Sequence, residues 1–183
     1  MKHKRPPTVT RAELMPDGTD RQFRGMMHNL LTITQTQQDN RESFAKMLGI
    51  TAIQYTILTA IAHLSDTNDG VAVVDIARHL YITGSFVSME TNKLARQGLI
   101  EKRPDADDKR RLRLSLTDRG WSYLESMVST QQPVNDAFFD RLTTNDFLEL
   151  SRLLSVLAQN SRRARATFML LEEESRINQD EEV

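Results

Sequence analysis

The chain has 183 residues, of which 39% are hydrophobic and 27% charged, and its formal net charge is −1. This length and composition fit a single domain, and no apolar run is long enough to cross a bilayer. The sequence contains no cysteine, which excludes disulfides, thiolate nucleophiles and iron–sulfur ligation within it. No apolar stretch follows the basic residues 1–5, so we expect no secretory signal and a cytoplasmic, soluble protein.

Apolar residues recur three and four positions apart in the first 48 residues, which predicts an amphipathic helix. The members of this stripe are Phe23, Met26, Met27, Leu30 and Leu31, followed after a polar stretch by Phe44, Met47 and Leu48. A second helix is predicted over residues 51–64. Its core face is Ile53, Ile57, Leu58 and Ile61.

A helix-turn-helix pattern follows. A short helix is predicted over residues 73–81, with Ile76 and Leu80 on one face. A break at residues 82–84 precedes a second predicted helix over residues 85–97. Two helices joined by a tight, glycine-containing turn fit the DNA-binding arrangement whose second helix enters the major groove.

The second of these helices has clear start, core and stop signals. Thr83 or Ser85 is predicted to cap its amino end, and Gly98 with Leu99 to supply a left-handed stop with its hydrophobic contact. The predicted core positions of this helix are Val87, Thr91 and Leu94.

The next segment alternates apolar and polar residues, which is typical of a half-buried strand. Leu112, Leu114 and Leu116 share one face. Residues 100–103 are the predicted partner strand and residues 104–108 the turn, so that Lys109, Arg110 and Arg111 project from the end of a hairpin. This arrangement is a wing. A helix over residues 121–129 and another apolar stripe follow it. That last stripe consists of Phe147, Leu150, Leu153, Leu154 and Leu157.

The charges are unevenly distributed. Residues 76–119 contain ten Lys and Arg against six Asp and Glu, a local +4, whereas residues 172–183 contain six acids and one Arg. A basic region suits phosphate contact, because neutralising phosphates releases counterions. We expect the acidic end to be a solvated or frayed tail.

Taken together, residues 50–120 resemble the winged helix-turn-helix of the MarR family of bacterial transcription regulators. The matching pieces are Asp75-Ile-Ala, Ser85-Phe-Val-Ser, Asn92-Lys-Leu, Gln97-Gly-Leu-Ile, Arg103-Pro-Asp-Ala-Asp-Asp-Lys-Arg110 and Leu116-Thr-x-x-Gly120. The resemblance implies a mainly α fold with a small β-hairpin wing and long terminal helices. It also implies a homodimer, in which the terminal helices of two subunits interlock, and double-stranded DNA with an inverted-repeat operator as partner.

This layout predicts four regions. They are an N-terminal arm and dimerisation helix (1–48), a winged helix-turn-helix (49–120), C-terminal helices that complete the dimerisation region (121–172) and an acidic tail (173–183).

The residues predicted to contact DNA lie on the second helix and at the wing tip. They are Thr83, Ser85, Ser88, Met89, Asn92, Lys93, Lys109, Arg110 and Arg111. Asn pairs with adenine, and an apolar Met89, where many relatives have a polar or basic residue, favours contact with a thymine methyl group. Arg110 suits a narrow minor groove, and Asp108 resembles the family's acidic partner of that arginine. A merely solvated role is the competing interpretation for each helix residue.

Glu90 departs from the family pattern, which usually has an apolar residue at this position. Since its neighbours Val87 and Leu94 are core residues, we expect Glu90 to be partly covered. An acid would repel phosphate, so pairing with a basic side chain inside the lobe is favoured over DNA contact.

Family members commonly bind a small molecule, often an aromatic acid. Arg24 and His28, one helical turn apart, with Tyr55 as an aromatic neighbour, are a hypothetical carboxylate anchor, although an ordinary polar-face role is the favoured interpretation. The four His residues, at 3, 28, 63 and 79, lack metal-ligand spacing, so no metal site and no cofactor are predicted.

The predicted function is therefore a sequence-specific, dimeric DNA-binding transcription regulator, a repressor that a small-molecule effector releases. Two alternatives stay open: a winged-helix protein-interaction module, and a DNA-binding factor that responds to no ligand. An enzyme is not predicted, because the paired carboxylates lie in a turn and near a charged terminus, and no phosphate loop or nucleophile motif appears.

Overall fold

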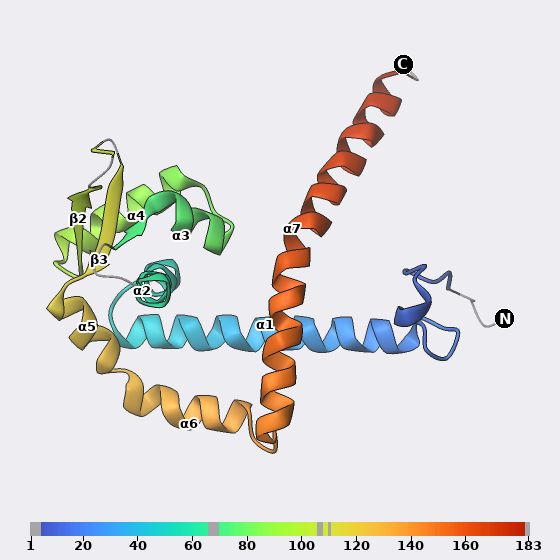
Figure 1. Ribbon diagram of the computed structural model, residues 1–183, viewed down its shortest axis with the longest axis horizontal. Coiled ribbons are helices and arrows are strands. Elements are labelled where there is room, and N and C mark those ends of the chain that lie inside the picture. The colour runs from blue at the N-terminus through green and yellow to red at the C-terminus, as the bar shows by residue number, and fades with distance from the viewer. Residues whose placement is uncertain (1–4, 66–69, 106–107, 110, 182–183) are drawn as a thin grey trace. The chain divides into compact units, whose positions relative to one another are not determined.

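The structure is a computed structural model, and it describes residues 5–65, 70–105, 108–109 and 111–181 (Figure 1). The chain divides into two compact units, one within Met1–Ser129 and one within Thr130–Val183. Helices dominate, and the described strands form one small antiparallel sheet. The predicted mainly α fold with a β wing is confirmed.

The first unit contains the long helix α1 (Arg21–Met47), with a short 3-10 helix (Ala12–Leu14) preceding it. Asp20, which is buried, fastens the N-terminal segment to the start of α1. Its carboxylate accepts hydrogen bonds from the backbone N–H and hydroxyl of Thr8, at 2.9 and 3.0 Å, and it pairs with Arg24 at 2.7 Å. Within the chain, only the last turns of α1 are buried, around Phe44 and Ala45.

Helix α2 (Ala52–Leu64) forms the centre of the core and lies at 95° to α1, so that Figure 1 shows it end-on. A capping box starts it: the Thr51 hydroxyl accepts from the Gln54 N–H, and the Gln54 side chain accepts from the Thr51 N–H. Ile57 and Ile61 are fully buried, as predicted. In the described part of the chain, no single helix is long and apolar enough to span a membrane. Only α1 and α2 taken together, as this bent pair, have the required length and composition.

The helix-turn-helix consists of α3 (Val73–Leu80) and α4 (Gly84–Arg96), and both helices are confirmed within a residue or two of their predicted bounds. Thr83 caps α4 by accepting a hydrogen bond from the Phe86 N–H at 3.2 Å. Gly98, at a φ of 70°, ends the helix, and the Leu99 N–H donates to the Leu94 carbonyl at 3.0 Å. The predicted stop is therefore confirmed.

The wing is a hairpin of β2 (Ile100–Pro104) and β3 (Leu112–Leu116), paired from Ile100↔Leu116 to Pro104↔Leu112. A third strand, β1 (Val71–Ala72), was not predicted; it pairs with the other edge of β3. Leu114 and Leu116 are buried as expected, but Leu112 is 42% exposed. Leu112 lies beyond the three-stranded part of the sheet, because β1 pairs only with Arg113 and Leu114 of β3.

The Leu-Thr-x-x-Gly motif joins the wing to α5 (Asp118–Glu125). The Thr117 hydroxyl accepts from the Gly120 N–H at 3.0 Å and donates to the Gly98 carbonyl at 2.7 Å. Gly120 is buried directly against the Leu99 carbonyl. Thr117 and Gly120 thereby fix α5 to the end of α4. We call α2 to α5, residues 52–125 as far as they are described, the winged lobe.

The second unit contains most of α6 (Val128–Phe138) and all of α7 (Thr144–Glu181). Phe138, Phe139 and Phe147 stack edge to face, with ring centroids 4.9 and 6.0 Å apart. We expected residues 172–183 to be a solvated or frayed tail; the structure continues α7 to Glu181, and residues 172–178 are exposed. The predicted stripe is exposed in the single chain, as are further apolar residues of α7. The most exposed are Leu148, Leu170 and Leu171.

Candidate nucleic-acid interface

The face of α4 that points away from the core is largely exposed to solvent. Ser85, Met89, Asn92 and Lys93 are exposed, and Ser88 is half-buried. Thr83, also exposed, uses its hydroxyl in the helix cap and lies 3.1 Å from the Ser85 hydroxyl. All six predicted contact residues in and next to α4 thus lie on one helix, although Thr83 and Lys93 already have partners inside the chain.

Glu90 is the exception on α4, because this residue is only 4% exposed. It accepts a hydrogen bond from the Gln54 side chain at 2.9 Å and from the Lys93 ammonium at 2.7 Å. The predicted pairing with a basic side chain is confirmed. Since Gln54 also closes the cap of α2, this cluster ties the start of α2 to the middle of α4.

The Glu90 cluster makes stability depend on pH. Burial by itself raises the pKa of Glu90, but the hydrogen bonds from Lys93 and Gln54 and the ammonium charge outweigh it and hold the pKa below its usual value. The stabilisation is therefore present above the ordinary carboxyl pKa, about 4.3, and is lost as the pH falls through the lower folded-state value.

We expect Glu90→Gln to unfold with a weaker dependence on pH below about 4.5 than the parent, because it has no carboxylate to protonate. Thermal unfolding between pH 3 and 7 measures this. Glu125→Gln, which changes an exposed acid, serves as the control and should keep the parent's acid sensitivity. Identical pH profiles for the parent and Glu90→Gln would contradict the assignment.

Lys102 on β2 is a residue that the sequence analysis missed. Its ammonium donates to the Thr91 hydroxyl at 2.9 Å and to the Asn92 side-chain oxygen at 2.8 Å. Burial lowers the pKa of Lys102. Because lysine only donates, the Asn92 oxygen must face it, and the amide NH₂ of Asn92 is left for other partners. This contact joins the wing to α4.

At the tip of the wing, Lys109 and Arg111 are exposed as predicted. Arg110 lies outside the described residues. We expected Asp108 to orient Arg110; among the described contacts, its carboxylate lies 3.4 Å from the guanidinium of Arg111. The tip therefore presents at least two described cations to solvent.

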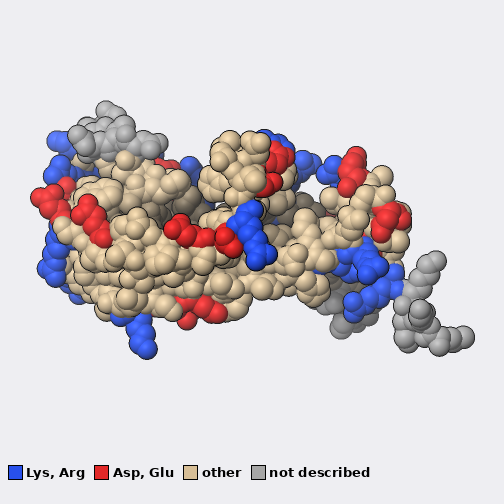
Figure 2. All heavy atoms as spheres, turned by 90° about the horizontal axis from the view of Figure 1, so that it is seen from below, with Lys and Arg blue, Asp and Glu red and all other residues tan. Residues whose placement is uncertain are grey.

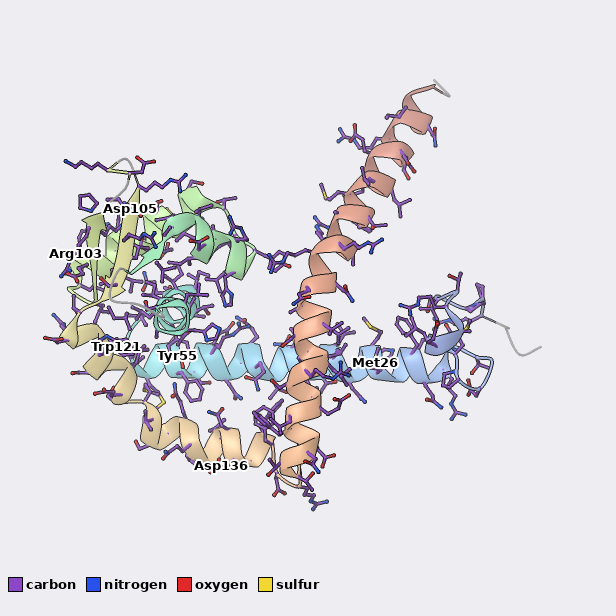
Figure 3. All side chains as sticks on the ribbon, in the orientation of Figure 1. Met26, Tyr55, Arg103, Asp105, Trp121 and Asp136 are labelled. Carbon is purple, nitrogen blue, oxygen red and sulfur yellow. The ribbon has the colours of Figure 1, made fainter. Side chains whose placement is uncertain are left out.

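A different acid, Asp105, holds the base of the wing. It is buried, it accepts from the Asp108 N–H at 3.1 Å, and its carboxylate pairs with Arg113 at 2.5 Å. Arg113 also donates to the Gly70 carbonyl next to β1, at 3.3 Å. Figure 3 shows Asp105 and Arg103 at the hairpin. Asp105 and Arg113 therefore connect the turn of the wing to the strand that precedes α3.

A hollow of about 620 Å³ separates the wing from the start of α3 and α4. Its lining residues include Arg78 from α3 and Arg111 directly before β3, together with Ser88 of α4. Exposed cations on both sides of a concave surface favour a negatively charged occupant such as a phosphate backbone.

The structure does not bring the three hypothetical effector residues together within one chain. Tyr55 packs on Phe44, with ring centroids 6.1 Å apart, whereas Arg24 lies twenty residues earlier on α1, about 30 Å away along the axis. In Figure 3, Tyr55 lies well apart from Met26, which is two residues after Arg24 on α1. Arg24 is paired with Asp20, and His28 is exposed. Sequence spacing placed Arg24 and His28 correctly on one helix but could not place Tyr55.

The sequence analysis considered only the spacing of the His residues along the chain. The fold brings two of them close together. His63 of α2 and His79 of α3 are both exposed, with ring centroids 5.6 Å apart. Among the described residues, no group of three or more His, Cys, Asp or Glu is arranged to hold a metal ion.

Residues 48–111, which cover α2, the helix-turn-helix and the wing's first strand β2, match the family model described as "MarR family". The predicted resemblance of the winged lobe to the MarR family is therefore confirmed. Two Bacillus subtilis proteins are similar to it. The uncharacterized HTH-type transcriptional regulator YwhA is 26% identical over 87 residues, 48% of this chain and 63% of its own length. The HTH-type transcriptional repressor MdtR is 25% identical over 123 residues, 67% of this chain and 76% of its own.

Solved structures of MarR proteins share the fold beyond the winged lobe. A MarR protein from Peptoclostridium difficile aligns with a TM-score of 0.64 and 20% identity, over 90% of this chain and 96% of that one. The S. aureus MepR–DNA complex aligns with a TM-score of 0.59 and 24% identity, over 73% and 94%. The sequence relatives YwhA and MdtR are described as a transcriptional regulator and a transcriptional repressor, in agreement with the sequence analysis.

Proposed function

We propose that this chain is a dimeric, sequence-specific DNA-binding transcription regulator of the MarR family, acting as a repressor that an effector releases. The observation that carries the proposal is the exposed face of α4 beside a hairpin whose tip bears Lys109 and Arg111. An α-helix fits the major groove of DNA, and cations beside that helix can contact the flanking phosphates. The relative MepR is described in complex with DNA, which supports the same use of this surface.

The terminal helices support assembly into a dimer. In the single chain, α1 leaves Met26, Met27, Leu31 and Ile33 more than 40% exposed, and α7 leaves a larger apolar set exposed. Figure 2 shows a face on which uncharged side chains cover much of the surface. Apolar residues at helical spacing on a long exposed helix favour burial against a second copy. Two copies would present two α4 helices to one DNA duplex.

We expect the full chain to select an inverted repeat from random duplex DNA, with half-sites about one helical turn, roughly 10 bp, apart. Analytical ultracentrifugation should show two chains per site and a dimer without DNA. Deleting residues 1–40 should abolish specific binding, because a single winged lobe makes too few contacts.

Titration of the chain with random duplex DNA at several salt concentrations tests the alternative of a protein-interaction module. Affinity for random duplex should fall steeply with salt, since contact with phosphates releases counterions. A stable monomer on an asymmetric site would contradict the dimer. Absence of any salt-dependent DNA binding would contradict the function and favour the protein-interaction alternative.

The effector, proposed to be a small aromatic acid by resemblance to the family, acts only through unequal affinity for two states of the protein. We expect a saturating effector to weaken operator binding by some factor, and operator DNA to weaken effector binding by the same factor. Calorimetric titration with and without DNA measures both. A compound that binds tightly yet leaves operator affinity unchanged is not the effector, and if no compound changes it, the chain is a constitutive DNA-binding factor.

A further inference from the structure

Two apolar side chains interrupt the exposed polar face of α4. Phe86 is 36% and Met89 46% exposed. They are three residues apart, so their Cβ atoms are neighbours on the helix surface, about 5–6 Å apart. Both lie in the first half of α4, which is the part of a recognition helix that contacts base edges.

Two polar groups within about one turn of Met89 are already engaged inside the protein. Lys93 donates to the buried Glu90 carboxylate at 2.7 Å, and the Asn92 oxygen accepts from Lys102 at 2.8 Å. The Ser88 carbonyl accepts from Thr91, and the Ser88 side chain is half-buried beside the hollow. The exposed centre of α4 therefore has fewer free hydrogen-bonding groups than its sequence indicates.

An exposed apolar pair needs an apolar partner to contribute to selectivity. In the major groove that partner is the C5 methyl group of thymine, since the other features that distinguish the base pairs there are hydrogen-bond donors and acceptors. The cations around α4 favour DNA over an apolar protein surface as the occupant, because Lys102, Arg96 and Arg111 all lie on α4 or the wing beside it.

We propose that Met89, with Phe86 beside it, recognises thymine methyl groups, so that each operator half-site carries a thymine opposite Met89. This inference rests on the proposed DNA-binding function and adds the chemistry of its specificity. A methionine thioether is flexible and polarizable, which suits contact with a methyl group at the floor of the groove.

The test uses the full chain and the sequence that it selects from random duplex. Each thymine is replaced in turn by deoxyuridine, which removes the methyl group and leaves every hydrogen-bonding group in place. We expect about a fourfold loss of affinity per half-site at the thymine opposite Met89, the factor that corresponds to one buried methyl-sized group.

Three variants then assign that loss to Met89. Met89→Gln keeps the length of the side chain but removes its apolar end, so it should bind the thymine and deoxyuridine duplexes equally. Met89→Leu should keep the preference for thymine. Ser85→Ala, on the same exposed face, is the control: whatever its affinity, it should retain the parent's sensitivity to deoxyuridine. Gln, Leu and Ala all favour helix, so these variants should fold.

The outcomes separate this inference from the function on which it rests. If the parent selects no sequence at all, the proposed function fails. If it selects an operator but deoxyuridine costs nothing at any position, or if Met89→Gln keeps the parent's sensitivity, the chain still binds specific DNA and the assignment to Met89 is overturned.

Discussion

Gly120→Ala is expected to destabilise the winged lobe by about 3 kcal/mol, the upper end of the usual effect of overpacking a core. A Cβ atom on Gly120 would overlap the Leu99 carbonyl oxygen and lie 3.1 Å from its carbon. Both groups are backbone, so no side-chain rotation relieves the clash. Thr117 holds α5 at this distance, since its hydroxyl bonds both the Gly98 carbonyl and the Gly120 N–H. Relief of the clash therefore requires α5 to move away from α4.

Urea unfolding of the full chain measures this loss. Gly84→Ala is the matched control, because a Cβ atom there meets nothing within 4 Å and the φ angle is not left-handed. We expect it to unfold within about 1 kcal/mol of the parent. A Gly120→Ala protein as stable as the Gly84→Ala protein would show that α5 does not pack against the end of α4 as described.

Removing the two described cations of the wing tip, with Lys109→Ala and Arg111→Ala together, should weaken binding to every DNA sequence by about tenfold or more. The slope of log affinity against log salt should fall by about two units, one for each lost phosphate contact. Base preference should remain, because these side chains lie on the hairpin and the exposed face of α4 is unchanged.

Equilibrium binding of operator and random duplex at several salt concentrations tests this expectation. Arg152→Ala, which removes an exposed cation of α7, is the control and should leave the salt slope at the parent's value. If the double variant binds random duplex as tightly as the parent, the hairpin is not a DNA-contacting wing, and the protein-interaction alternative becomes the better account.

Local signals in the sequence were sufficient for the elements of the winged lobe. The Thr83 cap, the Gly98 stop and the alternation of leucines in β3 each depend on neighbouring residues, so spacing alone predicted them. The family resemblance then supplied their order in space. The strand β1 was missed because two residues, Val71 and Ala72, are too few to show a period.

Contacts made by the hairpin could not be predicted from the spacing of residues along the sequence. Lys102 meets Asn92 only because β2 folds back beside α4, and Asp105, rather than Asp108, holds Arg113 because the turn places it inside the wing. The three hypothetical effector residues do not meet within one chain for a similar reason. Tyr55 lies on α2, which crosses α1 at its far end, so periodicity on one helix carries no information about the other.

The bridge from Arg113 to the Gly70 carbonyl, with β1 paired to β3, makes the wing and the helix-turn-helix one sheet-linked body. In the proposed dimer on DNA, we therefore expect base preference to depend on side chains of α4, and half-site spacing to depend on the length and packing of the terminal helices. Substitutions on α4 should consequently redirect the protein to new operators without changing the spacer length. Insertions of whole helical turns in the terminal helices should alter the spacer while the preferred half-site is retained.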